Sequence, residues 1–203
     1  MVLLYIETNF LMSIATGRDS DAHKLLWQKP TSLQLVIPGI CYMESLSALE
    51  DEVKRYNSSQ ERLKNLKSEA IRDFTSANAR SLSFNIEQSL VDYRNRMTEI
   101  KNRLYQAIDQ LSQQGEMIDL TPEIVQESLN NPLITKDPTD NLILHCILHH
   151  AKTRPDDVKV FISGNIEEFR QLLEVQDALQ AAGVVKYFSQ TENYLGWLQS
   201  QSS

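Results

Sequence analysis

Short apolar runs alternate along the chain with longer segments in which apolar residues recur every three or four positions. The apolar runs lie at 2–6, 35–37, 117–120, 158–163 and 184–188. Runs of this kind, without polar residues alternating inside them, are typical of strands buried on both faces. Apolar residues at helical spacing predict helices at about 9–16, 20–27, 167–182 and from 191 onwards. Thr121 and Pro138 are expected to open two further helices. Strands that alternate with helices predict an α/β fold with a central parallel sheet covered on both faces.

One long stretch departs from this alternation. Residues 40–114 contain neither proline nor glycine, and apolar residues follow one another at steps of three and four from Ile86 to Ile108. This stripe predicts a long amphipathic helix. We therefore expect a helical-hairpin insertion at about 45–114 within a single domain that spans residues 1–203.

Two groups of weak helix formers predict where the helices of this stretch end. At 57–59 the chain reads Asn-Ser-Ser, and Ser58 precedes Glu61 by three positions, as in a capping pair. A second candidate break lies at 81–83. The hairpin should accordingly contain two or three helices.

Charge is distributed unevenly between this stretch and the rest of the chain. The formal net charge of the whole chain is −7, yet residues 54–103 hold eleven Lys or Arg against six Asp or Glu. That segment is therefore +5 and the remainder is −12. Such an asymmetry favours a basic surface for an anionic partner, and a solvated helix surface of mixed charge is the alternative.

Several classes of protein are not expected. No apolar run approaches the roughly 20 residues that span a bilayer, so we expect no membrane helix. The first apolar run lacks a preceding basic region, which argues against a secretory signal. Cys41 and Cys146 lie in apolar surroundings and lack a CxxC spacing. We therefore expect them to be buried, reduced thiols, as in a cytoplasmic protein.

Acidic or amide side chains lie at the ends of four predicted elements. Glu7 follows the first apolar run, Glu44 lies early in the helix after the second, Asp140 opens a helix, and Asn165 follows the run at 158–163. The carboxyl ends of parallel strands meet at one edge of a sheet. We therefore expect these four side chains to converge in one pocket at that edge.

The segments that contain these residues carry a resemblance to a known family. They read LLYIETN, VIPGICYMESL, KDPTDNLILHCIL and VFISGNIEEF. In this order, each after the expected element, they resemble the PIN domain, a family of metal-dependent RNA nucleases. The resemblance covers roughly residues 1–50 and 117–190 and implies a three-layer α/β/α PIN-like fold.

The resemblance also implies roles for individual residues. Glu7, Glu44, Asp140 and Asn165 would form the catalytic, metal-binding set, with Asp137 as a further metal ligand one helical turn before Asp140. Oxygen ligands of this kind suit Mg²⁺ or Mn²⁺. Such an ion can stabilise the charge of a phosphodiester and make a nucleophile from water.

Other residues would support this set. Asn9 would orient the first carboxylate, and Ser163 would add a polar group at the rim of the pocket. Arg94, Lys101 and Arg103, from the basic stretch, would bind RNA phosphates. If these cations point away from the pocket, the stripe from 86 to 108 is expected to pack against a second copy and form a homodimer.

Two positions depart from the family pattern. Glu7 stands where the family usually has Asp, which moves the carboxylate outward by about one C–C bond, or about 1.5 Å. Asn165 stands at a position that is usually acidic, which removes one negative charge. Displacing catalytic groups by about 1 Å can lower a rate on the order of a hundredfold.

Three hypotheses about function follow. The first is a divalent-metal-dependent ribonuclease that cleaves single-stranded RNA endonucleolytically with water as the nucleophile. The second is a catalytically degenerate PIN-like module that binds RNA or a protein through its hairpin. The third is the toxin of a toxin–antitoxin pair, whose small antitoxin partner occludes the site. An antitoxin gene immediately upstream would distinguish the third from the first.

Overall fold

A five-stranded parallel sheet forms the centre of the molecule, whose computed structural model describes residues 1–201. In spatial order the strands are β3 (Glu116–Ile118), β2 (Leu33–Pro38), β1 (Val2–Tyr5), β4 (Val158–Ile162) and β5 (Val184–Phe188). All four pairings between neighbouring strands are parallel. This sheet, flanked by helices, confirms the α/β prediction and agrees with a PIN-like fold.

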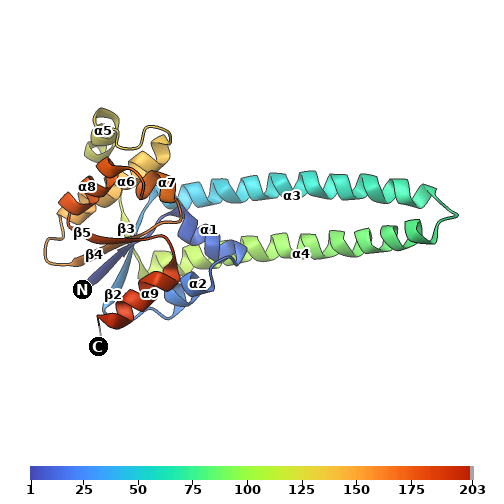
Figure 1. Cartoon of the computed structure of the whole chain (residues 1–203), viewed down its shortest axis with the longest axis horizontal. Coiled ribbons are helices and arrows are strands. Elements are labelled where there is room, and N and C mark those ends of the chain that lie inside the picture. Colours follow the sequence, from blue (N-terminus) through green and yellow to red (C-terminus); the bar gives the residue numbers. More distant parts are fainter. Residues whose placement is uncertain (202–203) are drawn as a thin grey trace.

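Helices cover both faces of the sheet, so its three central strands β1, β2 and β4 are largely buried. Figure 1 shows α6 and α8 on one face and α2 and α9 on the other. The helices of this part of the chain are α1 (Thr8–Thr16), α2 (Ser20–Trp27), α5 (Pro122–Asn130), α6 (Pro138–Lys152), α7 (Ile166–Phe169), α8 (Leu173–Ala181) and α9 (Thr191–Ser200). None of the helices among residues 1–201 has both the length and the apolar character to cross a membrane.

The single helix predicted at about 167–182 is wrong, because the chain forms two helices there. Phe169 is fully buried and packs edge-to-face on Phe161, with ring centroids 5.1 Å apart. Leu173, four residues later, is 74% exposed. Residues four apart share one face of a continuous helix, so the helix ends after Phe169 and a new one starts at Leu173 in another direction.

Two long helices project from the sheet as a hairpin (Figure 1). They are α3 (Ile40–Arg72), of 33 residues, and α4 (Ala77–Gln114), of 38 residues. At 1.5 Å per residue these helices are about 50 and 57 Å long. α3 begins directly after β2, so the hairpin starts at the edge of the sheet where the carboxyl ends of the strands lie.

The helix breaks predicted at 57–59 and 81–83 are wrong. Both segments lie inside continuous helices, because side chains at helical spacing on either side of them pack against the opposite helix. The actual turn is at 73–76. There the Asp73 carboxylate accepts hydrogen bonds from the backbone N–H groups of Thr75 and Ser76, and the Ser76 hydroxyl caps α4 by accepting from Ala79 N.

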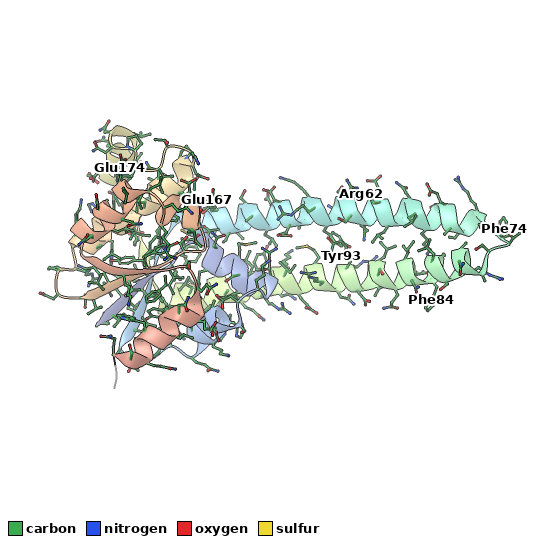
Figure 2. All side chains as sticks on the ribbon, viewed as in Figure 1. Arg62, Phe74, Phe84, Tyr93, Glu167 and Glu174 are labelled. Carbon is green, nitrogen blue, oxygen red and sulfur yellow. The ribbon has the colours of Figure 1, made fainter. Side chains whose placement is uncertain are left out.

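The two helices of the hairpin meet along a seam of half-buried side chains. Tyr56 of α3 packs on Tyr93 of α4 with ring centroids 5.0 Å apart, and Figure 2 shows Tyr93 between the helices. Lys67 and Glu87 form an ion pair of 3.1 Å across the seam. The apolar stripe from 86 to 108 faces this seam and the body of the same chain. The expectation that this stripe packs against a second copy is therefore wrong.

Candidate active site at the carboxyl ends of the strands

Glu7 lies at the junction between β1 and α1 and is 2% exposed. Its side chain caps α1, since Oε2 accepts a hydrogen bond of 2.7 Å from the backbone N–H of Asn9. Oε1 is buried and has no well-formed hydrogen bond among residues 1–201. A buried oxygen without a partner is unfavourable, so this carboxylate has capacity for one more ligand.

Glu44 approaches Glu7 from the second turn of α3. The hydroxyl of Thr8, the first residue of α1, donates a hydrogen bond to Glu44 Oε2. Thr8 is buried and Glu44 is half-buried. Because Thr8 follows Glu7 directly, this contact ties α3 to the β1–α1 junction and holds the two carboxylates near each other.

Asp140 and Asn165 form a second pair from α6 and the end of β4. Asn165 Nδ2 donates a hydrogen bond of 2.6 Å to Asp140 Oδ2, and Asp140 is 9% exposed. Asp137 is exposed and caps α6 by accepting from the N–H groups of Thr139 and Asp140. Asp137 therefore lies beside the pair, but its carboxylate serves as the N-cap of α6.

Ser163 and Asn9 lie next to these carboxylates. The Ser163 hydroxyl is buried and accepts a hydrogen bond of 3.0 Å from Asn165 N, while its carbonyl accepts from the Tyr187 hydroxyl at 2.6 Å. The Asn9 side chain is exposed, and its backbone rather than its amide group holds Glu7. Asn9 thus positions the carboxylate in a way that any residue with an N–H group can reproduce.

Two of the carboxylates, Glu7 and Asp140, have raised pKa values. Burial is the main cause that raises the pKa of Glu7 to about 7, and the negative charges of Asp140 and Glu44 add to it. The hydrogen bond from Asn9 N and the nearby hydroxyl of Ser163 act in the opposite direction and lower this pKa. Burial likewise raises the pKa of Asp140 to about 6, together with the nearby charges of Asp137, Glu44 and Glu168.

No cation of the protein neutralises this acidic cluster, which we define as Glu7, Glu44, Asp140 and the amide of Asn165. Within residues 1–201, none of its three carboxylates takes part in an ion pair. Like charges in a poorly solvated site disfavour their common ionisation. The cluster is therefore short of positive charge.

A cavity of about 300 Å³ is lined by Glu7 and by residues of α1, but not by Glu44, Asp140 or Asn165, so the four predicted residues do not share this cavity. Its lining includes Ser13, Arg18 and Thr191 in addition to Glu7 and Ser163. Arg18 brings a positive charge to the cavity, while Asp19 at the same end accepts a hydrogen bond from Thr191. An anionic group that reached Glu7 through this cavity would pass Arg18.

The three cations expected to bind RNA do not share one face of α4. Arg103 lies beside the end of α1, where a Cβ added to Gly17 would come within 3.0 Å of its Nη1 atom. Arg94 and Lys101 are seven residues apart and share a flank of α4, whereas Arg103 is about 160° around the helix from Lys101. Arg103 therefore lies on the side of Arg18.

The family is decided by a comparison with models of known families. The PIN domain model matches residues 4–169 of the chain. This chain belongs to the PIN domain family. Neither a curated protein nor a solved structure matches it.

The residues of this PIN domain fit a hard divalent cation in kind. Carboxylate and amide oxygens are the ligands that Mg²⁺ and Mn²⁺ prefer, and the unpartnered Oε1 of Glu7 is of that type. Within residues 1–201, however, no three His, Cys, Asp or Glu side chains are arranged so that they could already hold a metal ion.

Sequence reasoning missed three residues at this site of the PIN domain. One is Thr8, the residue after Glu7, which opens α1 and donates a hydrogen bond to Glu44. Glu168 raises the pKa of Asp140 and lies in the segment VFISGNIEEF, so the second glutamate was a readable signal. Arg18 had no signal, because the cavity forms only where α1, the end of β4 and the start of α9 meet.

Proposed function

We propose that this PIN domain is a divalent-metal-dependent ribonuclease that cleaves single-stranded RNA internally, in the cytoplasm. The observation that carries the proposal is the acidic cluster, in which Glu44 and Asp140 lie near enough to raise the pKa of Glu7 and no cation among residues 1–201 pairs with the three carboxylates. Such a cluster is suited to a metal ion supplied from solution. Bound there, Mg²⁺ or Mn²⁺ would neutralise the phosphodiester and lower the pKa of a bound water.

The chain's own residues have separable roles in this proposal. Glu7, Glu44 and Asp140 hold the ion, with Asn165 as an amide ligand and Asp137 at the edge of the set. Since Asn165 Nδ2 is engaged with Asp140 Oδ2, the amide both orients that carboxylate and leaves its own oxygen available.

Binding of the ion should reverse the pKa shifts of the cluster. Burial and mutual repulsion hold the pKa values of Glu7 and Asp140 at about 7 and about 6. A divalent cation favours the ionised carboxylates, so metal binding releases protons and strengthens as pH rises from 6 to 8. Affinity measured by calorimetry over this range should rise accordingly.

The decisive experiment uses Asp140→Asn and a circular, unstructured RNA. A circle has no ends, so only an endonuclease can cut it. We expect weak cleavage by the natural chain in millimolar Mn²⁺ or Mg²⁺ and none by Asp140→Asn. Asp177→Asn is the matched control, because Asp177 is an exposed residue of α8 and its substitution changes the charge equally. Cleavage by Asp140→Asn, or loss of cleavage in Asp177→Asn, contradicts the proposal.

A non-catalytic PIN module that binds RNA or a protein is the second candidate. Two observations favour it: Asn165 replaces the usual acid, and no three-ligand group is preformed among residues 1–201. If calorimetry in millimolar Mn²⁺ detects no binding and the circular RNA stays intact, this candidate replaces the enzyme. A toxin with an antitoxin partner is a special case of the enzyme, tested by the neighbouring gene.

We also propose a path for the RNA strand. Arg103 lies beside Gly17, the residue before Arg18, and Arg18 lines the cavity that Glu7 also lines. Phosphates that follow these two cations would reach the acidic cluster from the side of the cavity. Each phosphate contact adds about 0.7 to the slope of log affinity against log salt for a single strand.

This path separates the cations of α4 from one another. Arg103→Glu and Arg18→Glu should each weaken RNA binding and lower the salt slope by about one contact. Arg94→Glu and Lys101→Glu, on the other flank, should have smaller effects. Arg62→Glu is the control, since Figure 2 shows Arg62 far along α3 from the sheet. Equal effects of all these substitutions would indicate a diffuse attraction instead of a path.

A further inference from the structure

The outward face of α4 carries an uncharged strip where a solvated helix normally carries charges. Phe84, Val91, Thr98 and Tyr105 follow one another at intervals of seven residues. The amides Gln88, Asn95 and Asn102 lie between them. We call these seven residues the outer strip. At 100° per residue they lie within about 60° of Phe84, opposite the seam residue Tyr93, and Glu87 and Glu99 stand at the two edges of this sector.

All seven residues of the outer strip are exposed, and apolar or aromatic side chains recur along it at regular intervals. Phe84 is 72% exposed, Tyr105 is 48% exposed and Val91 is 44% exposed. Figure 2 shows Phe84 on the side of α4 that faces away from α3. The four other residues of the strip are exposed as well, so no part of residues 1–201 covers it.

Charged residues border the strip in an order that is complementary to itself. Arg80 lies before its first residue and Asp109 after its last, both on the outward face. Glu87, whose carboxylate also forms the ion pair with Lys67 of α3, and Lys101 lie along one flank. Consider two antiparallel α4 helices related by a two-fold axis that passes between residues 94 and 95. Arg80 then lies level with the partner's Asp109. In the same register Glu87 lies level with the partner's Lys101, one residue off the exact match.

We propose that the outer strip is the interface of a homodimer in which two hairpins pack side by side and antiparallel. The interface is isologous, since each copy contributes the same surface. Phe84 packs on the partner's Tyr105, and Val91 packs on the partner's Thr98. Asn95 of both copies meets near the two-fold axis. This face is distinct from the seam, which α3 already covers.

Alternative arrangements of two copies lose this complementarity. A parallel pair places Arg80 level with Arg80 and Asp109 level with Asp109 of the partner, and like charges repel. An antiparallel pair shifted by one heptad in one direction places Glu87 level with the partner's Asp109. Shifted in the other direction, it places Arg80 level with the partner's Asn102. Only the centred antiparallel register forms both charge pairs.

The centred register also brings the hairpin turn of each copy to the body of the other. In the centred register Ser76, at the hairpin turn, lies level with the partner's Gln113, near the end of α4. The hairpin segment 54–103 carries +5 and the rest of the chain −12. The tip of each basic hairpin therefore reaches the edge of the acidic body of the other copy, while the two α4 helices lie along each other between residues 76 and 113. RNA does not fit the strip, because phosphate binding needs cations and the strip has none.

The first test measures the oligomeric state of the full chain by sedimentation velocity. We expect a dimer that dissociates on dilution and in high salt. Phe84→Glu should raise its dissociation constant at least tenfold. Leu173→Glu is the matched control, since Leu173 is 74% exposed and lies on α8. A monomer at all concentrations up to roughly 100 µM, or a dimer equally tight in Phe84→Glu, overturns the proposal.

The register is tested by exchanging charges and by cross-linking. Arg80→Glu and Asp109→Arg should each weaken the dimer, and the double variant should restore it, because the pair is reversed in both places. Arg94 lies beside the two-fold axis in both copies, so Arg94→Gln should tighten the dimer. If the double variant is weaker than both single variants, the centred register is wrong.

Cross-linking gives a readout that does not depend on affinity. Cys41 and Cys146 are 0% and 1% exposed, so an introduced thiol is the accessible one. Asn95→Cys should oxidise rapidly to a disulfide-linked dimer, because position 95 meets itself near the axis. Asn57→Cys, on the exposed side of α3, should not. Equal cross-linking of the two variants contradicts the interface. These tests need no metal, so their outcome is independent of the proposed nuclease activity.

Discussion

The sheet body and the hairpin are held together in different ways. In the body, contacts join residues that are far apart in sequence: the Tyr5 hydroxyl bonds His150 at 2.9 Å, and Asn165 bonds Asp140. In the distal hairpin, contacts lie along one seam, where Tyr56 and Tyr93 are both only half-buried. Fewer buried contacts give lower local stability. Chemistry that needs fixed geometry is therefore expected in the body, and contacts with partners on the hairpin.

Charge follows the same division. The body gathers carboxylates at the carboxyl ends of its strands, and burial raises the pKa values of two of them. The hairpin segment 54–103 is basic and exposes uncharged side chains along the outer strip. Because the acidic cluster and the outer strip lie on different parts of the chain, a substitution in one can be made without changing the residues of the other.

The largest expected effect separates the two parts by stability. Leu104 is fully buried where α4 joins the body, and Leu63 is a half-buried residue of the distal seam. Leu104→Ala should lower the free energy of unfolding by about 2–5 kcal/mol, because it leaves a cavity in the core. Leu63→Ala should have a much smaller effect on global unfolding in urea and should speed amide exchange in the distal hairpin. Equal losses in the two variants would show that body and hairpin unfold as one unit.

The same division explains what the sequence predicts well. The three central strands are apolar runs because both faces of the sheet are covered there, so their positions can be read directly. Glu7 and Asp140 are recognisable because each stands at the end of such an element. The hairpin's turn was misplaced because Asn57 and Ser58 are weak helix formers whose side chains point to solvent, where packing elsewhere along the helix overrides them.

A better signal for the turn was present at 73–76. An Asp whose side chain bonds the N–H groups two and three residues on, followed by a Ser cap, has a local mechanism. By contrast, the cavity beside Glu7 and the bond between Thr8 and Glu44 depend on how separate helices meet. No local pattern specifies these contacts, so they require the structure.

The second prediction concerns the pH dependence of stability without metal. The pKa of Glu7 is about 7 in the folded chain, raised from 4.5. The folded state thus binds more protons, so the stabilisation is complete below pH 4.5 and is lost as pH rises through 7. The whole change is about 3 kcal/mol. Glu7→Gln should remove this decline, measured as thermal unfolding between pH 5 and 8 in the presence of a chelator.

Lys67→Gln serves as the matched control for this experiment, since it removes one charge from the hairpin's ion pair with Glu87. Its pH profile should follow that of the natural chain over the same range. Added Mn²⁺ should stabilise the natural chain most at pH 8, where the carboxylates are ionised. A natural chain equally stable at pH 5 and pH 8 without metal contradicts the assigned burial of Glu7.

A smaller effect is expected from restoring the usual acid at position 165. Asn165→Asp removes the hydrogen bond to Asp140 and adds a negative charge to the acidic cluster. The metal-free protein should become less stable at pH 8, while Mn²⁺ affinity should rise about tenfold, or about 1.4 kcal/mol. Asn78→Asp, near the tip of the hairpin, is the control with the same change of charge. Unchanged affinity in Asn165→Asp would remove this position from the proposed metal site.

The smallest effect tests whether the hairpin tip opens independently of the body. Ser76 accepts a hydrogen bond of 3.2 Å from Ala79 N and caps α4. Ser76→Ala should destabilise the first turns of α4 by about 1 kcal/mol, whereas Ser76→Gly should cost only a few tenths. Native-state amide exchange should register the loss at the tip, and the melting temperature of the body should stay unchanged. A fall in that melting temperature would mean that the tip and the acidic cluster are coupled through the whole length of the hairpin, and the division between a chemical body and a separate binding arm would fail.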